Sequence, residues 1–471
     1  MVRLSSIIML AFVLLGSAAP PVQAGPDMSR YTPILIEEFD RPLSRFDGTT
    51  GIWRDYPRRQ KYIGNGPPSL YVNPTMTRQD GSPLGLNPFR IEDSKLHIAA
   101  APIPQSDLSD VQALLRQAGY KEQAVQQVRY YSGSLSTFSS WSQTYGYFEM
   151  RAKLPEGKGH WSAFWLVPSV NGWPPEIDIF EVLGRENGNK GRGSPNNRVH
   201  LRVHFDEIAA DGSHAPEPTL TNPFEIVEGV PQPAIRRERQ KGPRFTFAKT
   251  VDVEKAFERQ IFDDFNTYAV SWTPDEIIWW FGSDSNNLRE IYRTPTPRDV
   301  TGPMAVIFNN QIGGKWAGAP DPAKDAETFA STFIIDYVKV FAQTPETIIE
   351  TDSANVQGAD TDERLIGSAA SQTFHPKGGF DILTGGGGAD RFVIAGDSGS
   401  KVITDFAVDD VLELAGWTFN TGPEALRRLE QVGSDVWLID EQEPQAPQTL
   451  IFRNLNRSDL TVANFEFRPG G

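Results

Sequence analysis

The stretch Tyr147-Phe-Glu-Met-Arg-Ala-Lys-Leu154 alternates its side chains with a period of two. Every second residue is apolar and the charged residues fall between them, which is the pattern of a β-strand with one buried face. Residues 268–272 repeat this spacing. Helical patterns are few: one covers about 108–117, which Gly119 would end, and one covers 253–261. Many strands and few helices favour an all-β sandwich over an α/β fold.

A second stretch, Glu176-Ile-Asp-Ile-Phe-Glu181, places three carboxylates in an otherwise apolar, strand-forming segment. Glu176 and Asp178 point to the same side of a strand, whereas Glu181 points the other way in a regular strand. One extra residue near Phe180, a β-bulge, would return Glu181 to the common face. Carboxylates gathered in this way are the groups that cleave a glycosidic bond. Acidic residues alternating with isoleucine also fit the solvent-facing side of a half-buried strand.

Aromatic residues surround this acidic segment in the sequence. Trp161, Trp165 and Trp173 lie shortly upstream, and flat apolar faces of this kind suit sugar rings. His204 on a later strand could line the same cleft, or it could be a hydrogen-bonded structural histidine. Trp316 follows two glycines and a lysine, so it could be a sugar platform or an ordinary aromatic residue of a surface loop.

Four successive motifs carry a family resemblance: Tyr131-Ser-Gly-Ser-Leu-Ser-Thr137, Tyr145-Gly-Tyr-Phe-Glu-Met-Arg-Ala-Lys-Leu-Pro155, Trp161-Ser-Ala-Phe-Trp165 and Trp173-Pro-Pro-Glu-Ile-Asp-Ile-Phe-Glu181. Together they closely resemble glycoside hydrolase family 16, over about residues 34–341. The resemblance implies a jelly-roll (concanavalin A-like) β-sandwich with a cleft across one sheet, and a retaining endo-acting glycanase. It also implies that Glu176 is the nucleophile, Glu181 the general acid/base and Asp178 the auxiliary carboxylate.

The implied reaction is a double displacement, in which the two glutamate carboxyls lie about 5–5.5 Å apart. Glu181 then needs a raised pKa, which its negatively charged neighbours favour. The sequence leaves the substrate open among β-1,3-glucan, mixed β-1,3-1,4-glucan and a bacterial exopolysaccharide. Asn266 stands where family members usually carry histidine, and residues 184–260 form a long segment rich in Gly, Pro and charge. A transglycosylase and a non-catalytic, lectin-like carbohydrate binder are the alternatives.

The first 24 residues fit a bacterial secretory signal peptide, with Arg3, an apolar run over 7–15 and the small-residue site Val22-Gln-Ala24. We therefore expect an extracellular protein that begins at Gly25. The net charge of -15 argues against nucleic-acid binding, and no later apolar segment is long enough to cross a membrane. The chain has no cysteine, so disulfides cannot stabilise the fold.

The pattern changes beyond the predicted catalytic sandwich, 25–342. Residues 343–357 are polar and indicate a linker. A nine-residue period follows, and its apolar positions would form an internal row: Leu365, Phe374, Leu383 and Phe392. The unit at 385–392 fits the glycine-rich nonapeptide that winds a parallel β-roll and binds Ca²⁺.

Residues 358–471 accordingly resemble the RTX (hemolysin-type) calcium-binding module. The resemblance implies a separate parallel β-roll that holds Ca²⁺ through hard oxygen ligands. The predicted ligands are the carboxylates of Asp381 and Asp390 and the carbonyls of Gly386 and Gly388. The repeats are degraded, because few of them keep the aspartate. A short glycine-rich turn without a metal is therefore the alternative.

Overall fold

The structure is a computed structural model of the 471-residue chain. It describes residues 25–56, 62–63, 69–138, 140–170, 172–184, 197–206, 234–235, 244–396, 398–441 and 447–468. The predicted signal peptide, 1–24, lies outside the described residues. In the part of the chain that is described, none of the helices combines the length and the apolar character that a membrane span needs.

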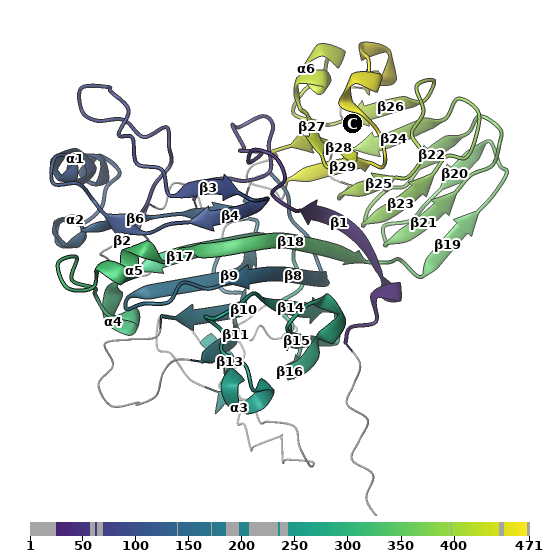
Figure 1. The fold of residues 1–471 in the computed structure, drawn as a ribbon. Coiled ribbons are helices and arrows are strands. Elements are labelled where there is room, and N and C mark those ends of the chain that lie inside the picture. The colour runs from purple at the N-terminus through teal and green to yellow at the C-terminus, as the bar shows by residue number, and fades with distance from the viewer. Residues whose placement is uncertain are drawn as a thin grey trace, which may run out of the picture.

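Two antiparallel sheets form the body of the protein (Figure 1). The first, called the supporting sheet, has the strand order β16-β15-β14-β8-β18-β4-β3, and β1 also pairs with β18. Its strands are β1 (Tyr31–Glu37), β3 (Phe89–Glu92), β4 (Lys95–Ile98), β8 (Gly146–Lys153), β14 (Asn266–Trp272), β15 (Glu276–Gly282), β16 (Arg289–Pro295) and β18 (Phe333–Gln343).

The second sheet, called the cleft sheet, has the order β12-β13-β11-β10-β9-β17-β7. Its strands are β7 (Ser134–Ser136), β9 (His160–Pro168), β10 (Glu176–Leu183), β11 (Arg198–Asp206), β12 (Ala234–Ile235), β13 (Arg244–Asp252) and β17 (Met304–Ile312).

The helices are α1 (Leu108–Gln117), α2 (Glu122–Gln127), α3 (Val253–Phe257), α4 (Gly314–Ala317), α5 (Ala326–Ala330) and α6 (Gly422–Arg427). The predicted all-β sandwich is confirmed, and of the two predicted helices α1 has the expected bounds while α3 is shorter.

The alternating stretch that predicted a strand is β8, at the centre of the supporting sheet. Phe148, Met150 and Ala152 are fully buried between the two sheets, as the alternation requires. On the opposite face Tyr147 and Glu149 are buried as well, whereas Arg151 and Lys153 are half-buried. The Tyr147 hydroxyl donates to Glu149, whose other oxygen accepts from the Tyr337 hydroxyl at 2.7 Å. Because of these hydrogen bonds, the Glu149 carboxylate is buried with a donor on each of its oxygens.

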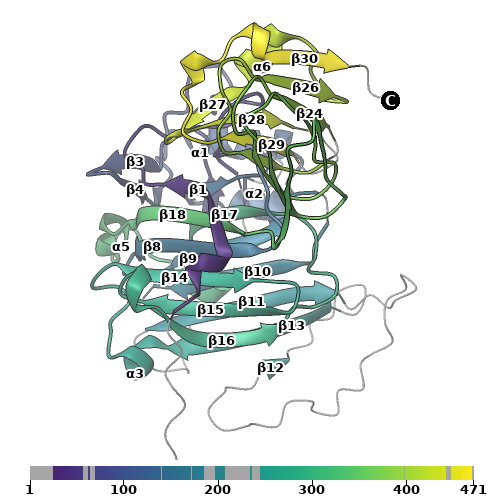
Figure 2. The ribbon, with the colours of Figure 1, turned by 90° about the vertical axis from the view of Figure 1, so that its right-hand side faces the viewer.

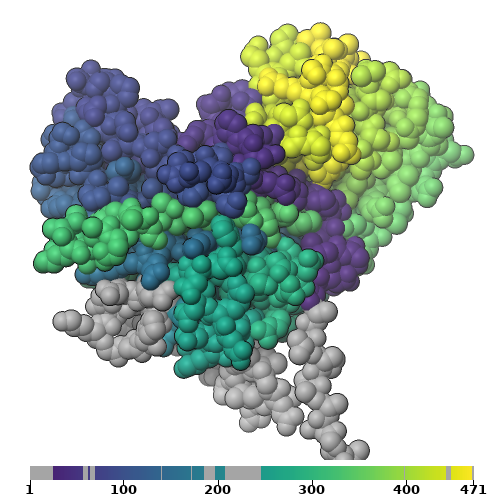
Figure 3. Space-filling view, viewed as in Figure 1, coloured from purple at the N-terminus to yellow at the C-terminus, as the bar shows by residue number. Residues whose placement is uncertain are grey.

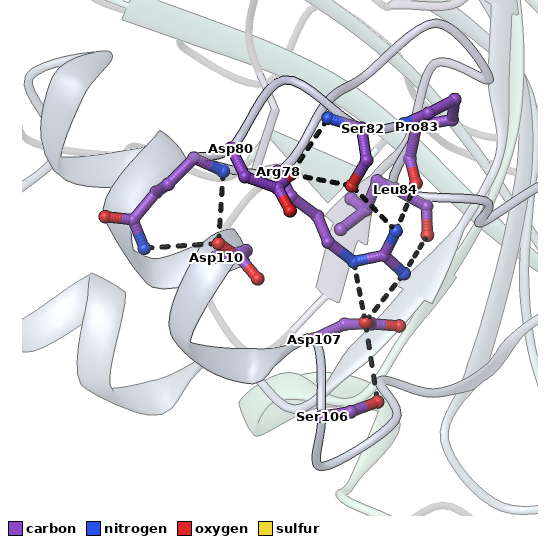
Figure 4. Close-up of polar contacts among 9 residues, drawn as sticks. Arg78, Asp80, Ser82, Pro83, Leu84, Ser106, Asp107 and Asp110 are labelled. Carbon is purple, nitrogen blue, oxygen red and sulfur yellow. Dashed lines mark hydrogen bonds and ion pairs between the residues drawn. The ribbon is translucent and has the colours of Figure 1, made fainter.

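A helical lobe stands beside the cleft sheet. It contains α1, α2 and a small sheet of β2 (Ser69–Tyr71), β5 (Ala101–Pro102) and β6 (Tyr130–Ser132). Arg78 fastens its long loop to the start of α1, donating to Asp107 at 2.9 Å and to the Leu84 carbonyl at 3.1 Å (Figure 4). The Tyr71 hydroxyl donates to Gln311 at 3.4 Å and so joins the lobe to β17.

The C-terminal part is a β-roll, as predicted, built of two further sheets. The first sheet contains β19 (Thr347–Glu350), β21 (Glu363–Ile366), β23 (Asp381–Thr384), β25 (Lys401–Ile403), β29 (Gln448–Phe452), β28 (Asp435–Asp440) and β27 (Leu429–Val432). The second contains β20 (Asn355–Gln357), β22 (Thr373–His375), β24 (Arg391–Ala395), β26 (Val411–Ala415) and β30 (Phe465–Arg468). Successive nine-residue units alternate between the sheets, so one full turn takes two units. The predicted internal row is fully buried, and Phe374 and Phe392 stack at 4.9 Å.

The roll has its own interior and also packs against the sandwich. One face of its first sheet points into the roll, but the opposite face joins the core of the sandwich through these residues: Ile382, Val402, Val432, Trp437, Ile439 and Ile451. Trp437 meets Trp141 of the sandwich with ring centroids 5.9 Å apart. Both views of the ribbon show the roll seated against the sandwich (Figure 2), and in the space-filling view it projects beside the helical lobe (Figure 3).

The predicted linker, 343–357, differs from the structure. It contains β19 and β20, which start the two sheets of the roll. Polar contacts reinforce the junction: the Ser44 hydroxyl donates to Glu430 at 2.5 Å, and Arg41 donates to the Gln431 carbonyl at 2.9 Å. The sandwich and the outer face of the roll's first sheet therefore share a hydrophobic core with a polar margin, and the roll has a second core inside it.

The two aspartates predicted as calcium ligands lie at different sheets of the roll, and each has partners within the protein. Asp381 is completely buried, and Lys401, also completely buried, places its ammonium 3.0 Å from one carboxylate oxygen. The other oxygen accepts from the Glu363 amide at 2.9 Å. Asp390 precedes a strand of the opposite sheet and accepts from the Gln372 amide at 2.8 Å. Both aspartates thus have protein partners, and Asp381 already has a cation.

The two glycines predicted as ligands have a steric explanation. A Cβ atom on Gly386 would lie 2.1 Å from the Ser368 carbonyl oxygen, and one on Gly388 would lie 2.6 Å from the Ser371 nitrogen. Both residues have φ of 91°, which favours glycine. Close contact between successive turns of the roll therefore requires glycine here without any metal.

We predict that Trp437→Ala lowers the free energy of unfolding of the whole protein by about 3–5 kcal/mol, because it empties a fully buried site in the shared core. Urea denaturation followed by circular dichroism should still show one transition, since sandwich and roll share that core. Val408→Ala, at a residue that is 72% exposed, is the control and should change nothing. A roll that unfolds in a separate, earlier step would contradict the shared core.

We also predict that Lys401→Met destabilises the protein by about 3–5 kcal/mol, because it leaves the Asp381 carboxylate buried without its cation. The double replacement Lys401→Met with Asp381→Leu should recover part of that loss. Calcium binding by the roll stays a prediction, and thermal unfolding of the unaltered protein with calcium and with a chelator tests it. A midpoint that rises with calcium would show that the protein binds the ion, and an unchanged midpoint would favour a roll without a metal.

Candidate active site

The site begins with an irregularity in β10. Glu176 pairs with His204 of β11, Asp178 with Arg202, and Glu181 with His200. Between the last two pairs β10 advances by three residues and β11 by two, so β10 contains one extra residue. The predicted β-bulge near Phe180 is therefore confirmed. Beyond an extra residue, the side chains that a regular strand would point to the core point to the cleft instead. Glu181 therefore lies on the same face as Glu176 and Asp178.

Tryptophan side chains hold the two glutamates. The indole of Trp173 donates to Glu176 at 2.8 Å, and the indole of Trp161 donates to Glu181 at 3.0 Å. The second oxygen of Glu181 forms an ion pair with Arg202. These contacts place two of the predicted aromatic residues beside the predicted catalytic pair, and they fix the orientation of both carboxylates.

Asp178 lies between the two glutamates along the strand and is only 4% exposed. Burial raises the pKa of Asp178 to about 6, while Arg202 and a hydrogen bond with Glu176 oppose the rise. Its backbone carbonyl accepts from the buried indole of Trp279 at 2.9 Å, which anchors the strand to the supporting sheet. Asp178 is therefore placed to share a proton with Glu176 and to hold its orientation.

His204 faces both of these acids. Its Nε2 lies 3.8 Å from Glu176 and 3.7 Å from Asp178, and its Nδ1 lies 2.9 Å from the Thr246 hydroxyl. Burial, assisted by Arg202, lowers the pKa of His204 to about 4, so the ring is neutral at neutral pH. The structure thus places His204 in the site. Its contact with substrate stays a prediction.

Glu176, Asp178 and His204 also bring their ligand atoms within 4.8 Å of one another, a spacing that a metal ion can bridge. In the described part of the chain no other group of three acidic or histidine side chains meets that criterion. Both carboxylates already have hydrogen-bond partners: the indole of Trp173 donates to Glu176, and Glu176 and Asp178 are hydrogen-bonded to each other. We therefore assign the group to acid chemistry.

The two remaining predicted aromatic residues flank the same face. The indole of Trp165 donates to Asn309 of β17 at 2.9 Å. Trp316 of α4 meets Trp161 edge to face, with ring centroids 4.8 Å apart. Both side chains are partly exposed, so they can offer apolar surface to a sugar ring.

Sequence reasoning missed four polar residues of this site: His200, Arg202, Thr246 and Asn309. The signal for two of them was available, because His200-Leu-Arg-Val-His204 alternates polar and apolar residues in a strand. Thr246 and Asn309 could not be found in this way, since their place beside the acids depends on the order of strands in the sheet.

Comparison with known proteins finds similarity to a glycosidase family in the region that contains this site. Residues 108–217 match the profile of glycosyl hydrolases family 16. The endo-1,3-1,4-beta-glycanase ExsH of Rhizobium meliloti (strain 1021) is 30% identical over 321 residues, which cover 67% of this chain and 53% of the relative. The beta-glucanase of Rhodothermus marinus is 31% identical over 231 residues, 45% of this chain and 62% of the relative. The chain thus spans about half the length of the first of these relatives.

Among solved structures, the laminarinase from Rhodothermus marinus aligns with 67% of this chain and 98% of its own, at 23% identity and a TM-score of 0.42.

The raised pKa of Asp178 predicts a pH-dependent gain in stability for Asp178→Asn. The folded state binds this proton more tightly than the unfolded state, so the carboxylate costs stability as pH rises from about 4 to about 6. Asparagine removes that cost. In urea denaturation the variant should match the unaltered protein at about pH 4 and exceed it by about 2–3 kcal/mol at about pH 7.

The lowered pKa of His204 acts in the opposite direction over the same pH range, but it is present in both proteins and does not create the difference. An asparagine variant that is less stable than the unaltered protein at pH 7 would contradict the placement of Asp178 in a desolvating environment.

Proposed function

We propose, on the premise that the chain contains a glycoside hydrolase family 16 domain, that the protein hydrolyses β-glycosidic bonds inside a polysaccharide with retention of configuration. The observation that carries this proposal is the bulged strand β10, which gathers Glu176, Asp178 and Glu181 on the cleft face. A purely structural strand gains nothing from three crowded acids, because each of them costs desolvation.

In the proposed reaction Glu176 attacks the anomeric carbon while protonated Glu181 gives its proton to the leaving oxygen. Water then attacks the glycosyl-enzyme, and Glu181 accepts a proton from that water. Asp178 stabilises the resting Glu176 through their hydrogen bond. His204 is neutral, so it lines the cleft beside Glu176 as a polar side chain and does not form an ion pair with the nucleophile.

We propose a β-1,3-glucan, a mixed β-1,3-1,4-glucan or a bacterial exopolysaccharide as the substrate. The names of the relatives, an endo-1,3-1,4-beta-glycanase and a beta-glucanase, support β-1,3 and β-1,4 linkages in the substrate. Trp161, Trp165, Trp173 and Trp316 supply aromatic surface suited to such sugars. We further propose that the protein acts outside the cytoplasm, on the basis of the signal-like segment 1–24.

Two alternatives differ in their products. A transglycosylase shares the covalent intermediate, and it would yield oligosaccharides longer than the starting material. A lectin-like protein would bind glycan and yield no product on long incubation. Chromatography of the products from a defined laminari-oligosaccharide separates all three activities.

We predict that Glu176→Gln lowers turnover of a β-glucan by at least about 10⁴-fold, because it removes the nucleophile without changing the size of the side chain. Reducing-end release from laminarin, lichenan and a bacterial exopolysaccharide is the measurement. Glu346→Gln, at an exposed residue between β18 and β19, is the matched control and should retain full activity. The unaltered protein should release products whose new reducing end first appears as the β-anomer by NMR.

Two results would oppose the proposal. Turnover by Glu176→Gln at more than about a hundredth of the normal rate would exclude Glu176 as the nucleophile. First appearance of the α-anomer would show inversion rather than retention.

A further inference from the structure

Arg202 occupies a position that the reaction itself does not explain. It lies on β11 directly opposite Asp178, and its guanidinium forms an ion pair with Glu181, the acid/base of the proposed function. The Arg202 side chain is 24% exposed and the Glu181 side chain 11% exposed, so the pair is largely shielded from water. A charge pair in such surroundings is stronger than one at the surface.

The guanidinium is also held from a second side. It lies 4.9 Å from the centre of the Trp316 ring, within the range of a cation–π contact. Trp316 in turn packs against Trp161, whose indole donates to the other oxygen of Glu181. Arg202, Trp316 and Trp161 therefore form a closed ring of contacts around the Glu181 carboxylate, and both of its oxygens have a donor.

The remaining charged and titratable groups near Glu181 do not reproduce this effect. Glu176 and Asp178 on the same strand are acids, which oppose its ionisation. Burial lowers the pKa of His200 and of His204 to about 4, so both rings are neutral at neutral pH. Lys315, beside Trp316, is exposed to solvent. The positive charge in contact with Glu181 is that of Arg202.

This arrangement conflicts with the first step of catalysis. A carboxylate paired with a guanidinium is held in its ionised form, whereas a general acid must carry a proton. The oxygen that contacts Arg202 cannot take up a proton while that contact persists. The ionised form that the pair favours is the form in which Glu181 must enter the second step, where it accepts a proton from water.

We propose that Arg202 is a positioning residue that holds Glu181 ionised between turnovers and withdraws from it when a glycan enters the cleft. Withdrawal lets Glu181 take one proton from solvent. That proton passes to the leaving oxygen as the glycosidic bond breaks and the bond to Glu176 forms. In the second step ionised Glu181 accepts a proton from the attacking water, and Arg202 returns to the carboxylate after that proton has passed to solvent and the product has left. The inference rests on the proposed function and assigns an added role within it.

The test compares Arg202→Met, which keeps an apolar stem over Trp316 but no charge, with Arg202→Lys, which keeps the charge. Arg198→Met, on the same strand and without a contact to Glu181, is the matched control. The readout is the pH profile of kcat/KM on a laminari-oligosaccharide. We expect the basic limb of the profile to move to higher pH by about 1–3 units in Arg202→Met. The basic limb should stay in place in Arg198→Met, and Arg202→Lys should keep most of the normal profile.

A dinitrophenyl laminaribioside supplies the second arm, because its leaving group departs without a proton. On this substrate the basic limb that reports Glu181 should disappear in all the proteins. An unmoved limb in Arg202→Met, or the same shift with the aryl substrate, would overturn the proposal and leave Arg202 with a packing role.

Carbon-13 NMR of the glutamate carboxyls, with Glu181 assigned from Glu181→Gln, needs no turnover. It should show Glu181 titrating at higher pH in Arg202→Met than in the unaltered protein. If the unaltered protein cleaved no glycan, the proposed function would fail, while this titration would still decide whether Arg202 governs the protonation of Glu181.

Discussion

One inserted residue in β10 is the constraint on which the site depends. In a regular strand Glu181 would point toward the supporting sheet, where a carboxylate would lie in the apolar core. The bulge directs it to the cleft, where Trp161 and Arg202 receive it. The apolar neighbours Ile177, Ile179 and Phe180 remain in the core and hold the irregular strand in place. The geometry of the acids is thus fixed by packing beneath them.

The roll shows how a repetitive element becomes part of a larger fold. Its first sheet is apolar on both faces, so one face can close the roll while the other covers the sandwich. The turns are closed by aspartate side chains that accept from backbone amides of the preceding turn, as Asp381 and Asp390 do. Asp381 is the one of these two acids that is completely buried, and the ammonium of Lys401 balances its charge. These contacts between successive turns come from the chain itself.

The sequence predicted what local periodicity controls. It predicted β8, α1, the bulge in β10 and the internal row of the roll, because each depends on spacing along a single segment. It did not predict that Val402 and Ile451 pack against the sandwich. Their strands are continuously apolar, and such a pattern shows that both faces are buried but not which part of the protein buries each face. It placed Asp381 among metal ligands because an ion pair with Lys401, twenty positions later, leaves no local pattern. Arg202 was missed although its strand alternates clearly, because its partner Glu181 is brought beside it only by pairing between strands.

The central claim is that the bulged strand presents Glu176 as the nucleophile of a covalent intermediate. A dinitrophenyl 2-deoxy-2-fluoro-laminaribioside slows both steps, and its good leaving group still allows the intermediate to accumulate. Mass spectrometry of the proteolysed protein should then find one glycosyl label, on the peptide that contains Glu176 and on that side chain. A label on Glu181, or turnover of substrate with no label on any residue, would contradict the account.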